Sequence, residues 1–281
     1  MGFLEGRKAI VTGGAMGIGL ATARRLLAQG CDVTIWDMNR DALEKASDEL
    51  KTLKQGAVYA HLCDVTDREK VMALASTAER EMGRVDILIN NAGIEKHGRF
   101  CDVSLDEWER ETAVNFRSIL YTTHAILPGM YRRNEGHIVN ISSAAGLIGV
   151  ADVAVYAATK WAVLGLTESL RAEAVMDGKN IAFTSVHPHF IREGLFSGGR
   201  LNLLGELLVP RIRSHDVVAR AIVDKALRRR RNVVKIPVTL HLGLLFRALL
   251  PDRWLQVVLV RLIGTGRCME KLVGYGNEKH L

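Results

Sequence analysis

The chain of 281 residues has few cysteines, and they form none of the patterns that bind metals or cross-link small secreted proteins. The four lie far apart with no CxxC pair: Cys31, Cys63, Cys101 and Cys268. This spacing excludes a disulfide framework and a cysteine zinc site. The N-terminus also lacks a basic region followed by an apolar signal core. We therefore expect a protein of a reducing compartment, the cytoplasm.

The positive charge of the chain does not follow a nucleic-acid-binding pattern. The net charge is +7 and the isoelectric point is about 9.4. The densest run, Arg228 to Arg231, follows a stretch with helical periodicity, and cations are favoured at helix C-termini. No aromatic residue alternates with these arginines, as single-stranded nucleic acid would require. We expect a solvated helix end or a patch facing a membrane, and no nucleic-acid partner.

Short runs rich in β-branched residues alternate with helical periods from residue 8 onward. KAIVTG, DVTIWD and VDILINNAG are such runs, and stretches such as IGLATARRLLAQG lie between them. This alternation predicts βαβ units on a parallel sheet, and the lack of polar alternation within the runs predicts helices on both faces. The sequence therefore predicts an α/β fold with a doubly wound, Rossmann-type parallel sheet, whose ligands bind at the carboxyl ends of the strands.

A glycine-rich turn follows the first predicted strand and leads into a helix, with the sequence TGGAMGIG from Thr12 to Gly19. Glycines in this place let the backbone approach a pyrophosphate, and the helix N-terminus offers free N–H groups. Asp37 ends the second predicted strand, where a carboxylate accepts hydrogen bonds from the adenine ribose and repels a 2′-phosphate. The pattern predicts NAD rather than NADP. The alternatives are a simple tight turn and a helix-capping Asp37.

Tyr156 and Lys160 lie one helical turn apart in the sequence YAATK, thirteen residues after Ser143. An ammonium beside a phenol stabilises the phenolate and lowers the tyrosine pKa from about 10, so the tyrosine can act as a general base. A Tyr/Lys pair alone is more often an ordinary helix face. The other motifs of the chain support a functional role for this pair.

Five motifs, in this order and at these spacings, resemble the short-chain dehydrogenase/reductase family. They are TGxxxGxG in the first turn, NNAG at Asn90 to Gly93, Asn115, Ser143 and YxxxK at Tyr156. The resemblance covers roughly residues 6 to 195. It implies a parallel sheet of about seven strands and NAD(P) as the hydride carrier.

The resemblance also implies a role for each matching residue. Tyr156 would be the general acid/base, and Lys160 would tune it and bind the nicotinamide ribose. Ser143 would hydrogen-bond the reacting oxygen, and Asn115 would hold a water in the proton relay. Tyr156 and Lys160 would contact the cofactor together with these residues: Gly13, Met16, Gly17, Ile18, Gly19, Asp37, Asp64, Val65, Asn91, Gly93, Pro188 and Ile191.

The chain departs from the family after the sixth predicted strand, in HPHFIRE. His189 stands where the family usually has glycine, and Glu193 stands where it usually has a threonine that binds the nicotinamide carboxamide. We expect His189 to narrow the space over the nicotinamide, while Ile191 still offers backbone groups. His187 and His189 have no third ligand evident in the sequence, so we expect packed or solvent-facing histidines and no metal site.

The segments after this point are expected to shape the substrate site. Residues 194–210 are apolar with glycines, which predicts a mobile lid over an oily pocket and a hydrophobic alcohol or ketone as substrate. Residues 1–235 are expected to form the dinucleotide-binding and catalytic domain, and residues 236–281 a C-terminal extension of it. After Pro251, Arg253, Gln256 and Arg261 share one arc of a helical wheel, which predicts an amphipathic helix with a broad apolar side.

The tail resembles, more loosely than the core motifs, that of the retinol and 17β-hydroxysteroid dehydrogenase branch. Its uncharged runs are shorter than the roughly 20 residues needed to cross a bilayer. Two interpretations stay open. The helix lies on a membrane surface with arginines 247, 253 and 261 at the headgroups, which predicts a cytoplasmic protein held peripherally on a membrane. Alternatively it packs on its own domain or on a sister subunit. We expect the protein to form a homodimer or homotetramer.

The sequence favours an oxidoreductase that transfers a hydride between NAD and a hydrophobic secondary or long-chain alcohol or ketone, steroid-like, retinoid-like or lipid-like. One alternative is an NADPH-dependent carbonyl reductase. Another is a non-catalytic nucleotide-binding scaffold on the same fold. The presence of Ser143, Tyr156 and Lys160 argues against the scaffold, and Glu193 is its best support.

Overall fold

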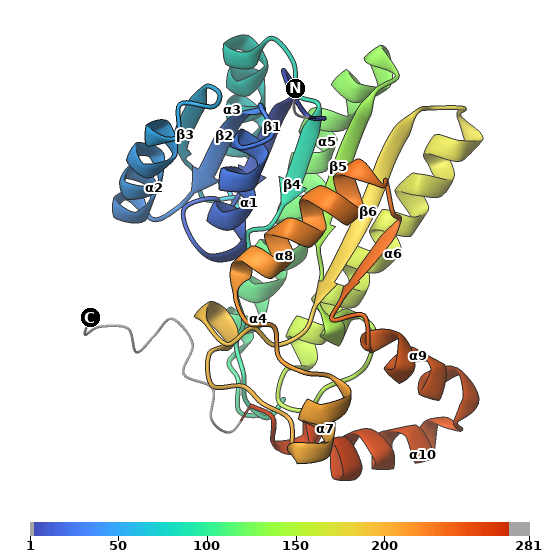
Figure 1. The fold of residues 1–281 in the computed structure, drawn as a ribbon. Coiled ribbons are helices and arrows are strands. Elements are labelled where there is room, and N and C mark those ends of the chain that lie inside the picture. Colours follow the sequence, from blue (N-terminus) through green and yellow to red (C-terminus); the bar gives the residue numbers. More distant parts are fainter. Residues whose placement is uncertain (1–2, 270–281) are drawn as a thin grey trace.

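A computed structural model describes residues 3–269 and contains one parallel sheet of seven strands (Figure 1). The strand order is β3-β2-β1-β4-β5-β6-β7. In chain order the strands are β1 (Lys8–Thr12), β2 (Asp32–Asp37), β3 (Val58–Leu62), β4 (Ile87–Asn90), β5 (Gly136–Ile141), β6 (Ile181–Pro188) and β7 (Val233–Ile236). The predicted doubly wound α/β fold is confirmed.

Helices cover both faces of the sheet, because successive strand residues point to opposite sides. Ala9 and Val11 of β1 belong to one core, together with α1 (Gly17–Leu27), α2 (Arg40–Thr52), α8 (His215–Ala221) and the π-helical η4 (Ile222–Arg228). Ile10, between them, belongs to the opposite core, which it shares with α3 (Arg68–Met82), α5 (Ser118–Arg133) and α6 (Ala154–Met176). Both faces of the central strands are therefore buried, which explains their uninterrupted apolar sequence.

The long helical period from Leu105 to Met130 is not one helix in the structure. It divides into α4 (Leu105–Thr112), a π-helical turn η1 (Ala113–Arg117), and α5. A capping box between Ser104 and Glu107 starts α4. Asn115 lies in the π-helical turn, a type of distortion that often marks functional positions.

Residues 194–210, here called the lid, and residues 236–269, here called the tail, lie together beyond the carboxyl ends of the strands (Figure 1). The lid contains the 3₁₀ turn η3 (Gly194–Phe196) and α7 (Leu203–Leu208), and the turn η2 (Ala144–Gly146) follows β5 nearby. The tail contains α9 (Leu240–Leu249), α10 (Asp252–Val257), the π-helical η5 (Val258–Ile263) and the 3₁₀ turn η6 (Thr265–Arg267). The helix predicted after Pro251 is therefore present, and α9 precedes it.

Hydrogen bonds tie the lid to the tail. The Asn202 side-chain amide donates to the Leu262 carbonyl at 2.8 Å, and the Arg200 backbone N–H donates to the Cys268 carbonyl at 3.2 Å. Within the described part of the chain, every helix is too short or too polar to cross a membrane.

Candidate active site

The carboxyl ends of the strands, the lid and the tail enclose a pocket of about 610 Å³. Most of the predicted site residues line it: Gly13, Met16, Gly17, Ile18, Asp37, Val65, Asn91, Gly93, Ser143, Tyr156, Lys160, Pro188 and Ile191. Three predicted residues, Gly19, Asp64 and Asn115, do not line it. The fold thus brings together motifs that are spread over nearly two hundred residues of sequence.

The glycine-rich turn between β1 and α1 is held closely against the end of β4. Gly13 and Gly17 have φ values of +60° and +57°, a backbone region that favours glycine. The Asn91 side-chain amide donates to the carbonyls of Thr12 and Gly13, each at 3.0 Å. A Cβ atom on Gly19 would lie 2.0 Å from the Gly13 carbonyl oxygen. Gly19 therefore packs directly against the turn, which a larger residue would displace. Gly13 and Gly17 line the pocket.

Asp37 presents a fixed carboxylate at the far side of the same turn. Its Oδ2 accepts the Ala15 backbone N–H at 3.1 Å, and its Oδ1 accepts the Asn39 N–H at 3.0 Å. Asp64 is placed differently, because it is exposed and its carboxylate accepts both the N–H and the hydroxyl of Thr66. Its neighbours Cys63 and Val65 line the pocket and Asp64 does not, so an adenine contact by the Asp64 side chain stays a prediction.

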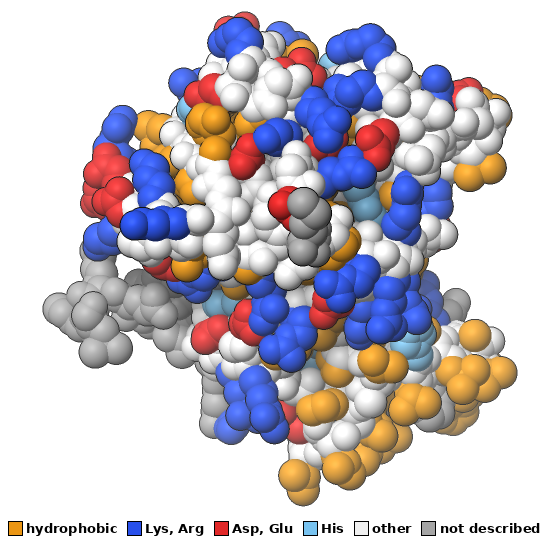
Figure 2. Space-filling model, turned by 45° about the horizontal axis from the view of Figure 1, so that its top comes forward, with side chains coloured by type: hydrophobic (Ala, Val, Ile, Leu, Met, Phe, Trp, Pro, Cys, Tyr) orange, Lys and Arg blue, Asp and Glu red, His pale blue; other side chains and the backbone are white. Residues whose placement is uncertain are grey.

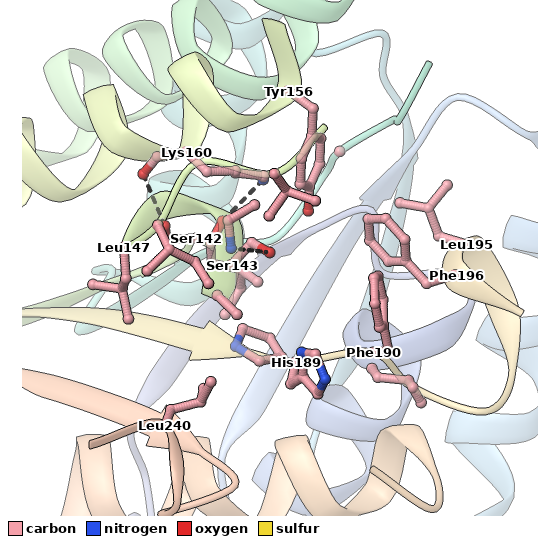
Figure 3. Close-up of a pocket in the computed structure, with 18 of the residues that line it drawn as sticks. Ser142, Ser143, Leu147, Tyr156, Lys160, His189, Phe190, Leu195, Phe196 and Leu240 are labelled. Carbon is pink, nitrogen blue, oxygen red and sulfur yellow. Dashed lines mark hydrogen bonds between the residues drawn. The ribbon is translucent and has the colours of Figure 1, made fainter. Parts of the chain in front are cut away.

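Ser143, Tyr156 and Lys160 meet between β5 and α6 (Figure 3). Tyr156 and Lys160 are each only 4% exposed. The Lys160 ammonium lies 5.4 Å from the Tyr156 ring centroid and donates to the Ile141 carbonyl at 3.1 Å. The Tyr156 ring packs edge-on against Phe196 of the lid, with the centroids 5.4 Å apart. The catalytic candidates are thus buried and fixed, and the lid contributes one wall.

Burial shifts the pKa values of the tyrosine and the lysine in opposite directions. It raises the pKa of Tyr156, which a hydrogen bond with Ser143 lowers in part. It lowers the pKa of Lys160 to about 8, and the negative charge of Glu111 opposes that shift. Burial disfavours the charged form of both side chains. The predicted lowering of the Tyr156 pKa by Lys160 stays a prediction.

His187, expected to be packed or solvent-facing, is a buried positioning residue whose contact with Ser143 the sequence did not predict. Its Nδ1 lies 3.0 Å from the Ser143 carbonyl oxygen, and its Nε2 lies 3.0 Å from the Ser185 hydroxyl. Burial lowers the pKa of His187 to about 4, so the ring is neutral at physiological pH. Nδ1–H then donates to the carbonyl and Nε2 accepts from Ser185. Both ring nitrogens are engaged, which holds Ser143 and leaves no nitrogen for a metal.

The two departures from the family pattern, His189 and Glu193, have separate explanations. His189 lines the pocket beside Phe190, with ring centroids 4.7 Å apart, and its Nε2 is buried with no partner among residues 3–269. Glu193 Oε1 accepts the His215 backbone N–H at 2.7 Å and lies 2.9 Å from His215 Nδ1. Its carboxylate therefore sits at the N-terminus of α8, where the helix dipole favours an anion.

Asn115 stands behind the pocket and holds the segment that follows β4. Its Oδ1 accepts the Ile94 N–H and its Nδ2 donates to the Ile94 carbonyl, both at 2.9 Å. Both ends of the side-chain amide are used in this way. The structure gives Asn115 a positioning role, and the relay water predicted beside it stays a prediction.

Apolar side chains surround one end of the pocket and reach the surface (Figure 2). Leu204, Leu242 and Leu262 line the pocket and are also 46%, 48% and 54% exposed, so the pocket opens here. We call this surface the apolar end. Its other exposed members belong to the lid and the tail: Leu203, Leu207, Leu245, Leu249, Trp254, Val257 and Val260.

Arg247, which the sequence suggested for a headgroup contact, has partners within the chain. Its guanidinium donates to the Leu147 carbonyl and lies 4.4 Å from the centroid of the Trp161 ring. It therefore joins α9 to the turn after β5 and to α6, and a headgroup contact stays a prediction. Arg253 and Arg261 remain exposed.

Comparison with known proteins places this site in a family. Residues 7–198 match the family model described as short chain dehydrogenase. The chain belongs to the short-chain dehydrogenase family. This short-chain dehydrogenase is 34% identical to epidermal retinol dehydrogenase 2 of Mus musculus over 249 residues, which span 88% of this chain and 79% of the relative. The resemblance to the family and to its retinol dehydrogenase branch is confirmed.

Solved structures of other members show the same fold. A short-chain dehydrogenase/reductase from Burkholderia phymatum in complex with NAD has a TM-score of 0.75 and 26% identity, covering 89% of this chain and 96% of the other. A metagenomic short-chain oxidoreductase in complex with NADP has a TM-score of 0.68 and 28% identity, covering 83% and 97%. The family is one of oxidoreductases that bind NAD(P), and membership does not choose between the two dinucleotides.

Proposed function

We propose that this short-chain dehydrogenase transfers a hydride between NAD and a hydrophobic secondary or long-chain alcohol or ketone. The observation that carries the proposal is the pocket itself. Ser143 and Tyr156 supply hydroxyl groups on one side, while apolar side chains of the lid and the tail supply the walls. A ligand that fills this space has one reactive oxygen and an otherwise apolar body. The mouse relative, which is named a retinol dehydrogenase, agrees with this substrate class.

The residues fit a dinucleotide. The turn at Gly13 and Gly17 lines the pocket with backbone in a conformation that favours glycine, and Asp37 offers a carboxylate at the end of β2. When bound, NAD supplies the acceptor for the hydride. Ser143 would hydrogen-bond the alcohol oxygen, and Tyr156 would take its proton. Lys160 would hold its positive charge near the phenol, and His187 and Asn115 would fix the segments that carry these groups.

A substrate panel tests the proposed activity. Retinoid, steroid and aliphatic alcohols are offered with NAD and with NADP, and the absorbance of the reduced cofactor is followed. We expect turnover of apolar alcohols with NAD. Activity only with NADPH and a carbonyl compound would favour the reductase, and binding without turnover of any compound would favour the scaffold. The best support for the scaffold, Glu193, is weaker now that this residue has a partner at α8.

Replacing Asp37 by alanine is expected to weaken NAD binding by at least about tenfold and to bring NAD and NADP affinities close together. The first effect follows because a charged hydrogen-bond acceptor contributes roughly 1.5–3 kcal/mol, and the second because the charge that repels a 2′-phosphate is gone. Dissociation constants for both dinucleotides are measured by calorimetry. Asp48→Ala, an exposed change of the same charge on α2, serves as the control. Equal affinity of the unmutated protein for NAD and NADP would contradict the proposal.

We also propose that the apolar end rests on a lipid surface, from which the substrate enters the pocket. Three observations support this: the pocket opens among exposed leucines, the exposed apolar side chains belong to adjoining segments, and Arg253 and Arg261 are exposed within the same tail. Large exposed apolar patches mark interaction sites, and helices with cations beside an apolar face lie on membranes.

Replacing Leu245, Leu249 and Trp254 by serine tests this surface. All three are more than half exposed and none lines the pocket. We expect at least a tenfold loss of co-sedimentation with phosphatidylcholine vesicles that contain phosphatidylserine, because each buried apolar side chain contributes roughly 1.5–3 kcal/mol. The control replaces Val175 and Met176, exposed at the end of α6, by serine. An unmutated protein that never pellets with these vesicles at low salt, or a triple variant that changes only the oligomeric state in size-exclusion chromatography, would favour the sister-subunit interpretation.

A further inference from the structure

Two carboxyl groups are buried close to the Tyr156 and Lys160 pair, and the proposed chemistry does not use them. Glu95 lies in the segment after β4, and its side chain is 2% exposed. Glu111 lies in the last turn of α4 and is 1% exposed. Glu95 Oε1 and Glu111 Oε2 have no hydrogen-bond partner among the described residues. Burying an unpaired carboxylate is costly, so the pair needs a compensating charge or proton.

Backbone and side-chain contacts link the segments that carry both carboxyl groups to the surroundings of Lys160. The helix α4 packs on α6, and Asn115, one turn after Glu111, reaches Thr159 of α6 at 3.4 Å. A Cβ atom on Gly93 would lie 3.3 Å from Asn115 Oδ1 and 3.5 Å from Lys160 Nζ. The segment that begins at Gly93 then continues to Lys96, whose N–H donates to Glu111 Oε1 at 3.0 Å. Residues 93–96 thus run from the ammonium to the two carboxyl groups.

We propose that Glu111 is the counter-ion that keeps Lys160 protonated, and that Glu95 is the buried carboxyl group that carries a proton. Glu111 is in this sense a positioning residue, because it acts through Lys160. The proposal deepens the proposed function, since it gives Lys160 the charge that its role at Tyr156 requires. Its test uses no substrate, so it can fail or succeed independently of the activity.

The pKa shifts of Glu95 and Glu111 agree with the different roles proposed for them. Burial raises the pKa of Glu95 to about 8, and the negative charge of Glu111 adds to that shift. Burial raises the pKa of Glu111 only to about 7, because the Lys96 N–H and the charges of Lys160 and Lys96 oppose it. As the pH rises, Glu111 therefore loses its proton before Glu95 does. The negative charge on Glu111 favours the protonated form of Lys160. Burial favours the neutral form and lowers the Lys160 pKa to about 8.

The other charged groups near the pair have partners of their own or face solvent. Lys96 forms an ion pair with Glu107 at 2.9 Å, and both side chains are exposed by 40% or more. His97 Nδ1 lies 3.6 Å from Glu95 Oε1, and its side chain is 47% exposed. From α6, Tyr156 is another titratable group near the pair, and a negative charge on either carboxyl group raises the Tyr156 pKa. Of these groups, Lys160 is the buried cation whose charged form Glu111 stabilises.

Replacing Glu111 by glutamine is expected to lower the pKa of Lys160 by at least about one pH unit, since an opposite charge at short range shifts a pKa by roughly 1–3 units. The charge on Lys160 is followed in the full-length protein through the chemical shift of isotopically labelled lysine Cε, with Lys160→Met assigning the signal. Glu109→Gln, two residues earlier on the exposed side of α4, is the matched control and should leave the titration unchanged. An unchanged Lys160 titration in Glu111→Gln overturns the proposal.

Glu95→Gln tests the second half, because glutamine resembles a protonated carboxyl group. We expect it to leave the Lys160 titration close to that of the unmutated protein, and an effect as large as that of Glu111→Gln would overturn the division between the two residues. The unmutated protein should also show the infrared carbonyl band of a buried protonated carboxyl group at neutral pH, and Glu95→Gln should lack it. This band keeps the proposal testable if Glu111→Gln does not fold, since its absence from the unmutated protein would contradict a protonated Glu95.

Discussion

Replacing Tyr156 by phenylalanine is expected to lower kcat for alcohol oxidation by at least about 100-fold while leaving NAD binding unchanged. The change removes only the hydroxyl group that we propose takes the substrate proton, and general acid/base catalysis contributes roughly 10²- to 10⁴-fold. The ring contact with Phe196 is kept, so the lid wall and the fold should be preserved. Steady-state kinetics with the best alcohol of the panel and calorimetry with NAD give the two quantities.

A second tyrosine provides the control for this experiment. Tyr121, on α5, is partly buried against the core on the α3 side of the sheet. Tyr121→Phe makes the same chemical change away from the pocket, and its kcat should stay within about twofold of the unmutated value, as for a change that leaves the reacting groups in place. If Tyr156→Phe kept most of its activity, the proton would have to leave by another group, and the roles proposed for Ser143 and Lys160 would need to be reassigned.

Sequence reasoning predicted the fold well because each of its signals is local. A buried parallel strand is a short apolar run, and a turn that binds phosphate needs glycines between a strand and a helix. Both features can be read without knowledge of distant contacts. The π-helical turn at Asn115 was not predicted, because periodicity over the whole segment is helical and the extra residue in one turn depends on the contact with Ile94.

The parts of the site that could not be predicted depend on partners far along the chain. Glu193 caps α8 through His215, 22 residues later, and His187 reaches Ser143 across the sheet, 44 residues away. Arg247 meets Leu147 over a separation of 100 residues. Helical spacing shows which side of a helix is polar and does not show what that side meets, so the contact of this arginine with Leu147 could not be predicted.

The tail illustrates the same limit for its apolar residues. A broad apolar side was predicted for the helix after Pro251, and the structure divides that side in two. Leu255 and Leu259 are buried, while Trp254 and Leu262 are exposed at the apolar end. Hydrophobic periodicity gives the width of an apolar side, and only tertiary packing decides how much of it the rest of the chain covers.

Replacing Gly19 by alanine is expected to weaken NAD binding by at least about 100-fold, which corresponds to roughly 2.7 kcal/mol. The added Cβ would lie 2.0 Å from the Gly13 carbonyl oxygen and 2.7 Å from Asn91 Nδ2. The first of these atoms is backbone, so the turn itself has to move. Its movement also strains the hydrogen bonds by which Asn91 holds the carbonyls of Thr12 and Gly13. The helix N–H groups that would face a pyrophosphate are displaced with it.

Gly165 offers the matched control, because it is exposed in the middle of α6 and a Cβ there meets nothing within 4 Å. Gly165→Ala should leave NAD affinity unchanged and stabilise the chain by about 1 kcal/mol, the difference in helix propensity between the two residues. Thermal unfolding and NAD calorimetry on both variants separate a local effect on the turn from a loss of folding. A folded Gly19→Ala protein that binds NAD with unmutated affinity would show that this turn does not hold the dinucleotide, and the pocket would have to bind it elsewhere.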